Sequence, residues 1–441
     1  MATVKPFRGV RYNPNKVGDL SKVVTQPYDR VEHGLQDQYY DLHPYNIVRI
    51  IKGKEYPGDD AAENVYTRAR DYYQVWLDAG YLLCDTRPAF YVYHQTFTLP
   101  DGRELTRRAY ISALELVEFD KGIVLPHERT LAGPKVDRLN LMRATAVNFG
   151  QIFMLYPDQE NRINALFDAA IAGRRADIDV RELWEKDVRQ QVWAVHDPEV
   201  LVQVRAEMAP KEGLIIADGH HRYETALNYR NEQRAQHPDA PPDAAFNYCM
   251  VSLVSMDDPG LTILPTHREI NNYAARSTAE VLDAAREYFQ VVPMPDRVAL
   301  EAAMLEDSPS ERHIGFYDGS YYLLKLKDLA AMDEVVPNRA PEWRSLHVSI
   351  LHELLIERIM GISKAAVEAK QNIDYHRDLD RALQHVDTGQ AQAVFIMNPT
   401  RMSQVKACSD RGEKMPQKST DFYPKVITGL VAMPVGEKER I

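Results

Sequence analysis

The spacing of apolar positions in the first third of the chain predicts helices combined with an antiparallel sheet. Apolar side chains recur at helical spacing over residues 65–77, and further helices are expected at 136–148 and 162–172. The aromatic and β-branched run 90–97 predicts a strand, and 105–116 is expected to return as its hairpin partner. The pattern therefore predicts a mixture of helices and strands in this part of the chain.

In the middle of the chain, short apolar strands alternate with helices. Strands are predicted at 192–195, 213–217 and 246–255. The pair Asp197-Pro198 is typical of a helix start, with an N-capping carboxylate and proline at the first helical position. Another helix is expected over 222–236. Such alternation favours a mixed α/β sheet.

The C-terminal part continues the mixture of helices and strands. Ser277 and Glu280 form a capping-box pattern that predicts a helix start. A hairpin is expected over 314–326, a helix over 346–360 and a strand over 393–397. No internal repeat is visible, so we expect interleaved domains rather than an array of repeats.

Composition sets limits on the class of protein. At 441 residues, 45% of them hydrophobic, the chain is longer than a usual single domain and can bury a sizeable core. The formal net charge of -11 argues against broad nucleic-acid binding, which needs a basic face. Cys84, Cys249 and Cys408 are far apart and suit reduced thiols. With no apolar run of the roughly 18 residues that cross a membrane, the cytoplasm is the expected location and a membrane partner is not expected.

The run from Ala217 to Tyr223 is the strongest candidate for chemistry. A strand, a tight Asp-Gly turn and a helix direct backbone N–H groups at an anion. Gly219 allows close approach of a ligand, and His220, His221 and Arg222 add donors for a phosphate. Asp218 can hold Mg²⁺ or orient a hydroxyl group. The alternative is a polar turn with an N-capping Asp and solvated histidines.

A second candidate is the pair His127-Glu128, which follows an apolar stretch. A carboxylate beside a histidine can serve as a general base. A His-Glu pair is also common on surfaces and at helix caps. The catalytic interpretation therefore depends on whether folding brings Glu128 to the Asp218 loop.

A third candidate is the loop over 412–425, in which lysines and hydroxyl groups are punctuated by Pro and Gly. Its end resembles a P-loop, but Gln417 stands where that motif requires glycine, so a Walker A motif is rejected. The alternative is a solvated loop. Arg268, after the strand at 262–264, adds a further cation, and the turn Gln26-Pro27-Tyr28-Asp29 is a candidate site lining. The candidate substrate or anion ligands are Arg268, Lys414, Lys418, Ser419, Thr420 and Lys425.

Taken together, these motifs resemble a bacterial and archaeal family of uncharacterised proteins, the domain-of-unknown-function family 1015. The resemblance covers nearly the whole chain, and the combination is more specific than any single piece. The motifs that carry it are Pro27-Tyr28-Asp29, Pro126-His127-Glu128, Asp218-Gly219-His220-His221-Arg222-Tyr223, Pro265-Thr266-His267-Arg268 and Met415-Pro416-Gln417-Lys418-Ser419-Thr420.

The central motif is also similar to the nucleotide-binding box of the ParB/sulfiredoxin superfamily, which includes ADP-dependent free-serine kinases. The resemblance implies that Gly219, His220, His221 and Arg222 contact phosphate and that Asp218 lies near the metal or the reacting hydroxyl. His220 occupies the place of the reactive sulfiredoxin cysteine, so sulfinate chemistry is not expected. The acidic net charge gives no support for the DNA-binding helices of ParB proteins.

The expected fold class is therefore α/β (mixed α+β), with a ParB/sulfiredoxin-like nucleotide-binding core elaborated by N- and C-terminal segments. We expect an N-terminal α+β region over 1–120, the core over 121–270, and a C-terminal α/β region over 271–441 that completes the site. These regions are expected to interleave.

The leading hypothesis is a nucleotide-dependent phosphotransferase, or small-molecule kinase, that acts on a small hydroxyl-bearing metabolite with ADP or ATP and Mg²⁺. Phosphoryl transfer needs mainly charge neutralisation and positioning. Asp218 and the nucleotide loop would act with Glu128, the candidate base, and with His127 beside it. One alternative is a nucleotide-binding regulatory protein. Both the phosphotransferase and the regulatory protein are compatible with a homo-oligomer. Another alternative is a metal-dependent hydrolase with ligands His127, His220, His221 and Asp218.

Overall fold

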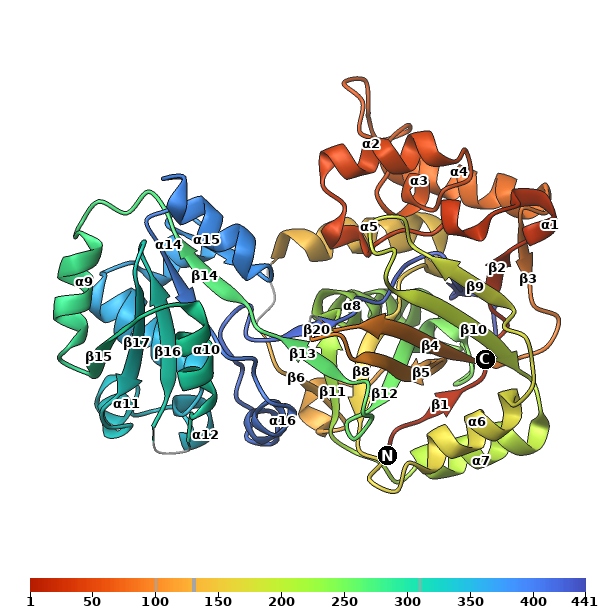
Figure 1. Ribbon diagram of the computed structural model, residues 1–441. Helices are drawn as coiled ribbons and strands as arrows, with labels where there is room; N and C mark the ends of the chain where they lie inside the picture. Colours follow the sequence, from red (N-terminus) through yellow and green to blue (C-terminus); the bar gives the residue numbers. More distant parts are fainter. Residues whose placement is uncertain (100, 129–131, 309–310) are drawn as a thin grey trace. The chain divides into compact units, whose positions relative to one another are not determined.

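A computed structural model describes residues 1–99, 101–128, 132–308 and 311–441 (Figure 1). Arg129 and Thr130, which follow the His127-Glu128 pair, lie outside the described residues. The chain forms two compact units that interleave in sequence. The first comprises Met1–Pro126, Thr130–Thr262 and Pro424–Ile441, and the second comprises His127–Arg129 and Ile263–Tyr423. The three regions expected from the sequence stay a prediction.

The first unit is built around a nine-stranded mixed sheet. Parallel pairs join β11 to β6 and β12 to β8, and the other neighbours run antiparallel. The predicted 90–97 and 105–116 hairpin is confirmed as β4 and β5. In sheet order the strands are β6 (Val124–Pro126), β11 (Leu214–Asp218), β8 (Ile152–Tyr156), β12 (Tyr248–Ser255), β5 (Glu104–Glu115), β4 (Phe90–Thr98), β10 (Arg189–Val195) and β9 (Ile178–Arg181), with β1 (Val4–Lys5) on β5.

The helices predicted over 65–77, 162–172 and 222–236 are present in the first unit. The capping carboxylate of Asp197 accepts from the N–H groups of Glu199 and Val200, which confirms the predicted helix start. α5 packs against both α4 and α8, and α6 packs against α7. The helices are α1 (Pro14–Val17), α2 (His33–Leu42), α3 (Val48–Ile51), α4 (Val65–Asp78), α5 (Ala132–Thr145), α6 (Arg162–Ile171), α7 (Pro198–Met208) and α8 (His220–Gln236).

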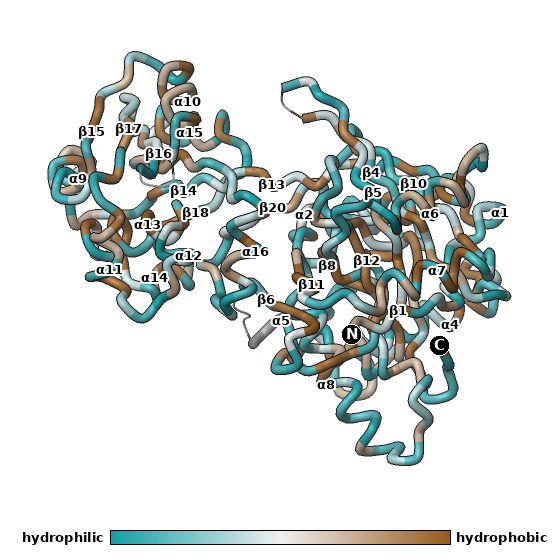
Figure 2. The backbone as a smooth tube through the Cα atoms, turned by 90° about the horizontal axis from the view of Figure 1, so that it is seen from below, coloured by the Kyte–Doolittle hydropathy of each residue, from teal (hydrophilic) through white to brown (hydrophobic). Residues whose placement is uncertain are grey.

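The core of the first unit lies on the central strands of its sheet. Every residue of β8 and β12 is buried, as expected for continuous apolar runs covered on both faces. Figure 2 shows the same strands as a hydrophobic band inside this unit. The strand β11 is buried up to Ala217, so its polar end at Asp218 comes where the core stops.

The predicted helix over 136–148 is displaced in the structure. α5 runs over Ala132–Thr145, and Ala146 adopts a left-handed φ of 52° that ends it. Val147 and Asn148 form the short strand β7, which pairs with β21 (Met433–Pro434). A pairing with residues almost 300 positions away cannot be read from local periodicity. The other short strands of this unit are β2 (Val10–Tyr12) and β3 (Leu82–Cys84).

The second unit contains a six-stranded sheet in which all paired neighbours run antiparallel. The predicted hairpin over 314–326 is confirmed as β16 and β17. In sheet order the strands are β15 (Phe289–Met294), β17 (Tyr321–Leu326), β16 (His313–Tyr317), β19 (Ala393–Ile396), β14 (His267–Ile270) and β18 (Ile373–His376). Two further short strands, β13 (Thr262–Leu264) and β20 (Asp421–Tyr423), pair with each other.

Helices α10 and α15 cover one face of this sheet and enclose an apolar cluster with it. The capping box at Ser277 and Glu280 is confirmed at the start of α9. The described helices are α9 (Thr278–Ala285), α10 (Arg297–Leu305), α11 (Ala330–Val335), α12 (Pro341–Arg344), α13 (His347–Ile350), α14 (Lys364–Glu368), α15 (Leu379–Asp387) and α16 (Met402–Asp410). None of the described helices combines the length and apolar character needed to cross a bilayer.

The predicted helix over 346–360 changes its winding after one turn. α13 is followed by the π-helix η5 (Leu351–Ile359). A π-helix has wider turns than an α-helix and is frequent at functional positions. The polar side chains of His352 and Glu353 in η5 are buried together with its apolar side chains.

Candidate functional site

The Asp-Gly turn predicted to bind phosphate joins β11 to α8 directly. Gly219 has a left-handed φ of 97°, a conformation that other residues rarely adopt. A Cβ atom at this position would lie 2.9 Å from Nε of Arg222. Glycine is therefore required both for the turn and for the close approach of the Arg222 side chain. The predicted strand, turn and helix are present, and α8 starts at His220.

Arg222 is held in place by groups on either side of the turn. Its guanidinium donates to Oδ2 of Asp218 at 2.5 Å and to the backbone carbonyl of Gln151. Only 13% of the Arg222 side chain is exposed. The cationic group is thus fixed at the first turn of α8, where the helix dipole also favours a negative ligand.

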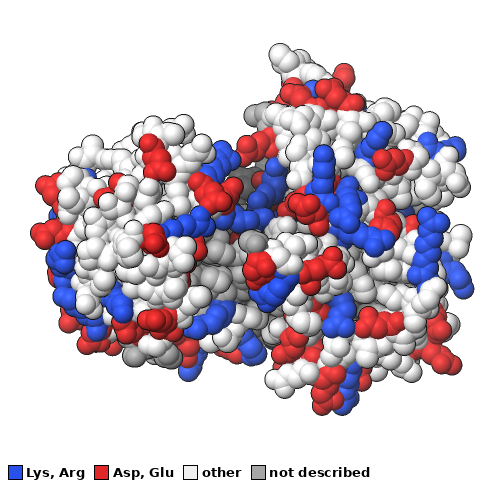
Figure 3. Space-filling view, viewed as in Figure 1, with Lys and Arg blue, Asp and Glu red and all other residues white. Residues whose placement is uncertain are grey.

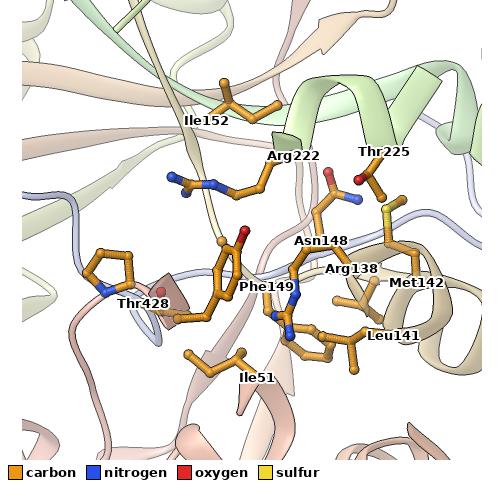
Figure 4. A pocket seen from close by; sticks show the side chains of 14 residues that line it. Ile51, Arg138, Leu141, Met142, Asn148, Phe149, Ile152, Arg222, Thr225 and Thr428 are labelled. Atoms are coloured by element: carbon orange, nitrogen blue, oxygen red, sulfur yellow. The ribbon is translucent and has the colours of Figure 1, made fainter. Parts of the chain in front are cut away.

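Arg222 lines a pocket of the first unit together with Arg138 from α5 (Figure 4). Tyr28 from the N-terminal segment belongs to the same lining. The Arg138 guanidinium lies over the Tyr28 ring, 4.1 Å from its centroid. Burial raises the pKa of Tyr28, and the charges of Arg222 and Arg138 oppose that rise. The cavity of about 50 Å³ has room for a group of the size of a phosphate rather than for a whole nucleotide.

Part of this pocket follows from the sequence. Pro27 and Tyr28 belong to the turn that the sequence indicates as a site lining, and they do line the pocket. The lining by Arg138, Asn148 and Thr225 was not predicted. Arg138 and Thr225 come from the adjacent helices α5 and α8, whereas Asn148 comes from the short strand β7. Only the packing of these elements shows that the three residues share a cavity.

The two histidines of the motif differ in their surroundings. His220 is buried, with 7% of its surface exposed, whereas His221 is half-buried. Burial lowers the pKa of His221, Glu224 opposes that change, and Lys135 adds to it. Lys135 and Glu224 form an ion pair with each other. His221 is therefore neutral at pH 7 and offers a neutral hydrogen-bonding group rather than a cation.

A buried arginine on β5 adds positive charge that no motif in the sequence indicates. Arg107 is fully buried, with its guanidinium 4.5 Å from the Phe153 ring centroid, and it donates to the carbonyl of Pro424 at 2.6 Å. Burial lowers the pKa of Arg107 to about 10, and Asp218 is among the carboxylates that oppose this. Arg107 therefore stays protonated at neutral pH and acts electrostatically on Asp218.

In the second unit, folding brings the His127-Glu128 pair to the predicted C-terminal loop. The N–H of Met415 donates to the carbonyl of His127 at 2.8 Å, and Glu128 pairs with Met415 in a parallel β-bridge. Nε2 of the buried His127 lies 2.9 Å from the Thr420 hydroxyl and 3.9 Å from Oε1 of Glu128. These two segments are almost 300 residues apart in the sequence.

Arg268 belongs to the same cluster. It is buried and donates to the carbonyl of Lys418 at 2.9 Å, with the Tyr375 ring centroid 5.4 Å from its guanidinium carbon. Burial lowers the pKa of Arg268 to about 10, and Glu128 is one of the groups that oppose this. A cation and a carboxylate thus act on each other beside the loop.

The remaining candidate anion ligands have different environments. Lys418 is exposed and has a left-handed φ of 57°, whereas Ser419 is buried and donates to the carbonyl of Pro416 at 2.5 Å. Lys414 is half-buried and lines a separate polar pocket of the second unit. Lys425 belongs to the first unit, where its carbonyl accepts from Gln95 at 2.9 Å.

Charge on the surface is mixed in sign. Figure 3 shows acidic and basic side chains interspersed over the drawn face of both units. This distribution agrees with the net charge of -11 and is unlike the continuous basic face of a nucleic-acid-binding protein.

Comparison with known proteins identifies a sequence family. The profile described as "Protein of unknown function (DUF1015)" matches residues 4–349. No curated protein matches the chain.

Several solved structures are similar at low identity. A conserved hypothetical protein from Pyrococcus furiosus is 13% identical over 70% of this chain and 89% of its own, with a TM-score of 0.32. A free serine kinase in complex with AMP is 14% identical over 70% and 86%, with a TM-score of 0.33. SbnI with a C-terminal truncation, from Staphylococcus aureus, is 10% identical over 73% and 87%, with a TM-score of 0.33. Likeness at this level carries no information on ligand or activity.

Proposed function

The chain belongs to the DUF1015 family of proteins of unknown function, and from the geometry of its own residues we propose that it is a nucleotide-dependent phosphotransferase acting on a small hydroxyl-bearing metabolite. The observation that carries the proposal is the Asp218-Gly219 turn, with Arg222 fixed beside the start of α8. Backbone N–H groups at a helix N-terminus and a guanidinium fork are both suited to phosphate oxygens.

The nucleotide phosphates are assigned to Gly219, His220, His221 and Arg222. Arg138 supports this assignment because it lines the same pocket as Arg222. The cavity accepts one phosphate-sized group, so the remainder of the nucleotide would extend from it. The choice of ADP or ATP over inorganic phosphate rests on the resemblance of the Asp218–Tyr223 motif to nucleotide-binding boxes.

Mg²⁺ is assigned to the carboxylate of Asp218 together with the nucleotide phosphates. One or two carboxylates plus substrate phosphates form the usual protein environment of Mg²⁺. Asp218 fits because it is an acidic group at the phosphate loop, although Arg222 already contacts its Oδ2 atom. When bound, the ion would neutralise charge on the transferred phosphoryl group.

A further group of residues is proposed for the substrate. Glu128 is assigned as the base that takes the proton from the substrate hydroxyl, with His127 beside it. Support for placing Glu128 at the reacting group comes from its position beside His127 and from its electrostatic interaction with the cationic Arg268. The substrate carboxylate or phosphate is assigned to Arg268, Lys414, Lys418, Ser419, Thr420 and Lys425.

Turnover of a nucleotide with a hydroxyl-bearing acceptor tests this function. The purified protein, incubated with Mg²⁺, ADP or ATP and a panel of hydroxy-amino acids, is expected to give a phosphorylated product detected by mass spectrometry. Glu128→Gln should lower kcat by at least about 100-fold, the usual contribution of a general base. Glu437→Gln is the matched control, because Glu437 also lies beside a histidine, 3.3 Å from Nδ1 of His237.

The outcomes separate the alternatives. An E128Q variant that is as active as E437Q would remove Glu128 from the mechanism. Nucleotide binding without turnover of any acceptor would contradict the phosphotransferase and favour a nucleotide-binding regulatory protein. In that case, nucleotide is expected to change the oligomeric state or partner binding equally in wild type and E128Q.

A further inference from the structure

Three potential metal ligands converge on the α15 side of the second unit's sheet. Glu269 lies on β14, His376 ends the neighbouring strand β18, and His385 lies in the last turn of α15. β14 and β18 pair antiparallel, with His267 opposite His376 and Glu269 opposite Asp374. Directly opposite residues point to the same face of a sheet. Glu269 and His376 therefore share one face of the sheet, and α15 packs against both of their strands.

The ligand atoms of these side chains are close together. Oε2 of Glu269 lies 2.8 Å from Nδ1 of His385 and 2.9 Å from Nε2 of His376. One ligand atom from each of the three residues lies within 4.8 Å of the other two. Among the described residues this is the one group of three or more His, Cys, Asp or Glu side chains with that property.

The contact of His376 with the carboxylate does not have hydrogen-bond geometry. Its Nε2 atom is buried and has no hydrogen-bond partner among the described residues, although Oε2 of Glu269 is only 2.9 Å away. Two potential ligand atoms thus lie close together without a hydrogen bond between them. A cation between them would satisfy both of them.

Burial makes the carboxylate costly without a positive partner. Glu269 has only 4% of its surface exposed, and within the described part of the chain its ion-pair partners are His376 and His385 alone. A buried carboxylate without a cation is unfavourable, because it has lost its hydration. The C-terminal turn of α15, where His385 lies, also favours a nearby positive charge.

We propose that Glu269, His376 and His385 form a binding site for a divalent transition-metal ion. Two imidazoles and a carboxylate suit Zn²⁺, Co²⁺, Ni²⁺ and Fe²⁺ better than Mg²⁺ or Ca²⁺, which prefer oxygen ligands. Bonds of about 2.0–2.2 Å place the ligand atoms of a tetrahedral zinc about 3.3–3.5 Å apart. The three ligand atoms already lie within 4.8 Å of one another, so only the side chains need to adjust. Three protein ligands leave a coordination position open for water or a further ligand.

This site is separate from the phosphate chemistry proposed above. It uses none of His127, His220, His221 and Asp218, the ligands that the sequence suggests for a metal-dependent hydrolase. Its residues lie on the second unit's own sheet and helix, and the proposal holds whether or not the protein transfers phosphate. The competing arrangement is a metal-free hydrogen bond from His385 to Glu269.

Metal uptake by the full-length, tag-free protein tests the proposal. Protein treated with a chelator and dialysed is titrated with Zn²⁺ by calorimetry, and bound metal is then quantified by mass spectrometry. One equivalent per chain and a higher melting temperature are expected for wild type. Glu269→Gln and His385→Ala should each weaken Zn²⁺ binding at least about tenfold, since even outer-shell changes cost 10–100-fold. His237→Ala, which removes a histidine from another His-Glu pair, should bind as wild type does.

Two further measurements keep the result unambiguous. The metal-free variants are checked by circular dichroism, because E269Q retains the size and the hydrogen-bonding oxygen of the native side chain. Co²⁺ added to wild type should give visible absorption bands that are lost in E269Q. Wild-type protein that takes up no stoichiometric Zn²⁺, or a folded E269Q variant that binds Zn²⁺ as tightly as wild type, would overturn the proposal.

Discussion

At Gly219, a single residue sets both the backbone of the phosphate loop and the position of its guanidinium. The left-handed φ of 97° strains any side chain here, and the 2.9 Å approach of Arg222 Nε means that a Cβ atom would displace Arg222. Gly319, in the β16–β17 turn, has a similar φ of 102°, but no atom lies within 4 Å of the position that a Cβ atom would occupy. Gly319 therefore has a similar backbone conformation without such a contact. Comparing Gly219 with Gly319 separates the effect of the left-handed backbone from the effect of the contact with Arg222.

Gly219→Ala is expected to abolish tight nucleotide binding, because the new methyl group displaces Arg222. Gly319→Ala should leave binding unchanged. Both variants should lose about 1–2 kcal/mol of stability from the left-handed backbone, with an additional loss in G219A. Urea denaturation and nucleotide titration of the two proteins measure these effects. Equal nucleotide affinity in G219A and G319A would contradict the role of the turn.

Some residues of the candidate site could be predicted from the sequence, and others could not. Asp218, Gly219 and Arg222 are adjacent along the chain, so a strand–turn–helix pattern was enough to indicate their geometry. Arg107 was missed because it lies within a strand as one polar residue among many, and only the packing of β5 shows that it is fully buried. Glu269 was missed for the same reason.

At the scale of elements, periodicity located most helices and strands but not their irregularities. The 90–97 and 105–116 hairpin was predictable because turn and strand signals are local. The end of α5 was not, since Val147 and Asn148 are taken into a pairing with Met433 and Pro434. The π-helix η5 was also unpredictable, because apolar spacing alone does not distinguish wide turns from α-helical ones.

A buried histidine of η5 leads to a prediction on how the stability of the protein depends on pH. Burial, together with the smaller effect of the charges of Arg268 and Lys364, lowers the pKa of His352 from an ordinary value of 6.5 to about 3. Below pH 6.5 the unfolded chain therefore takes up a proton that the folded protein excludes until about pH 3. The stability contributed by the neutral His352 is complete above pH 6.5 and falls by about 1.4 kcal/mol per pH unit below it.

His352→Gln should therefore reduce the loss of stability on acidification. His94 and His267, whose pKa values burial lowers to about 4, remain and keep part of the dependence. Urea denaturation of wild type and H352Q at pH 8, 6 and 5 measures the difference. The free energy of unfolding of wild type should fall more steeply with decreasing pH than that of H352Q, so the difference between the two proteins at pH 5 should not equal their difference at pH 8. A constant separation over this range would contradict the burial of a neutral His352.

At the scale of the whole molecule, the chain interleaves its two units rather than placing them one after the other. His127–Arg129 belongs to the second unit, although the segments on either side belong to the first. The loop around 415–420, Arg268 and Glu128 were each identified from residue type alone. Their meeting in one cluster depends on contacts between segments almost 150 to 300 residues apart, which no local pattern records.

The central claim is that the Asp218–Arg222 loop binds nucleotide phosphate, and calorimetric titration with ADP and ATP in the presence of Mg²⁺ tests it most directly. Wild type should bind one nucleotide per chain. Arg222→Lys should bind at least about tenfold more weakly, since the lysine cannot reproduce the guanidinium fork. Arg143→Lys, the same change in an exposed ion pair with Glu232, should bind as wild type does. No binding by wild type, or equal affinity in R222K and R143K, would contradict the account.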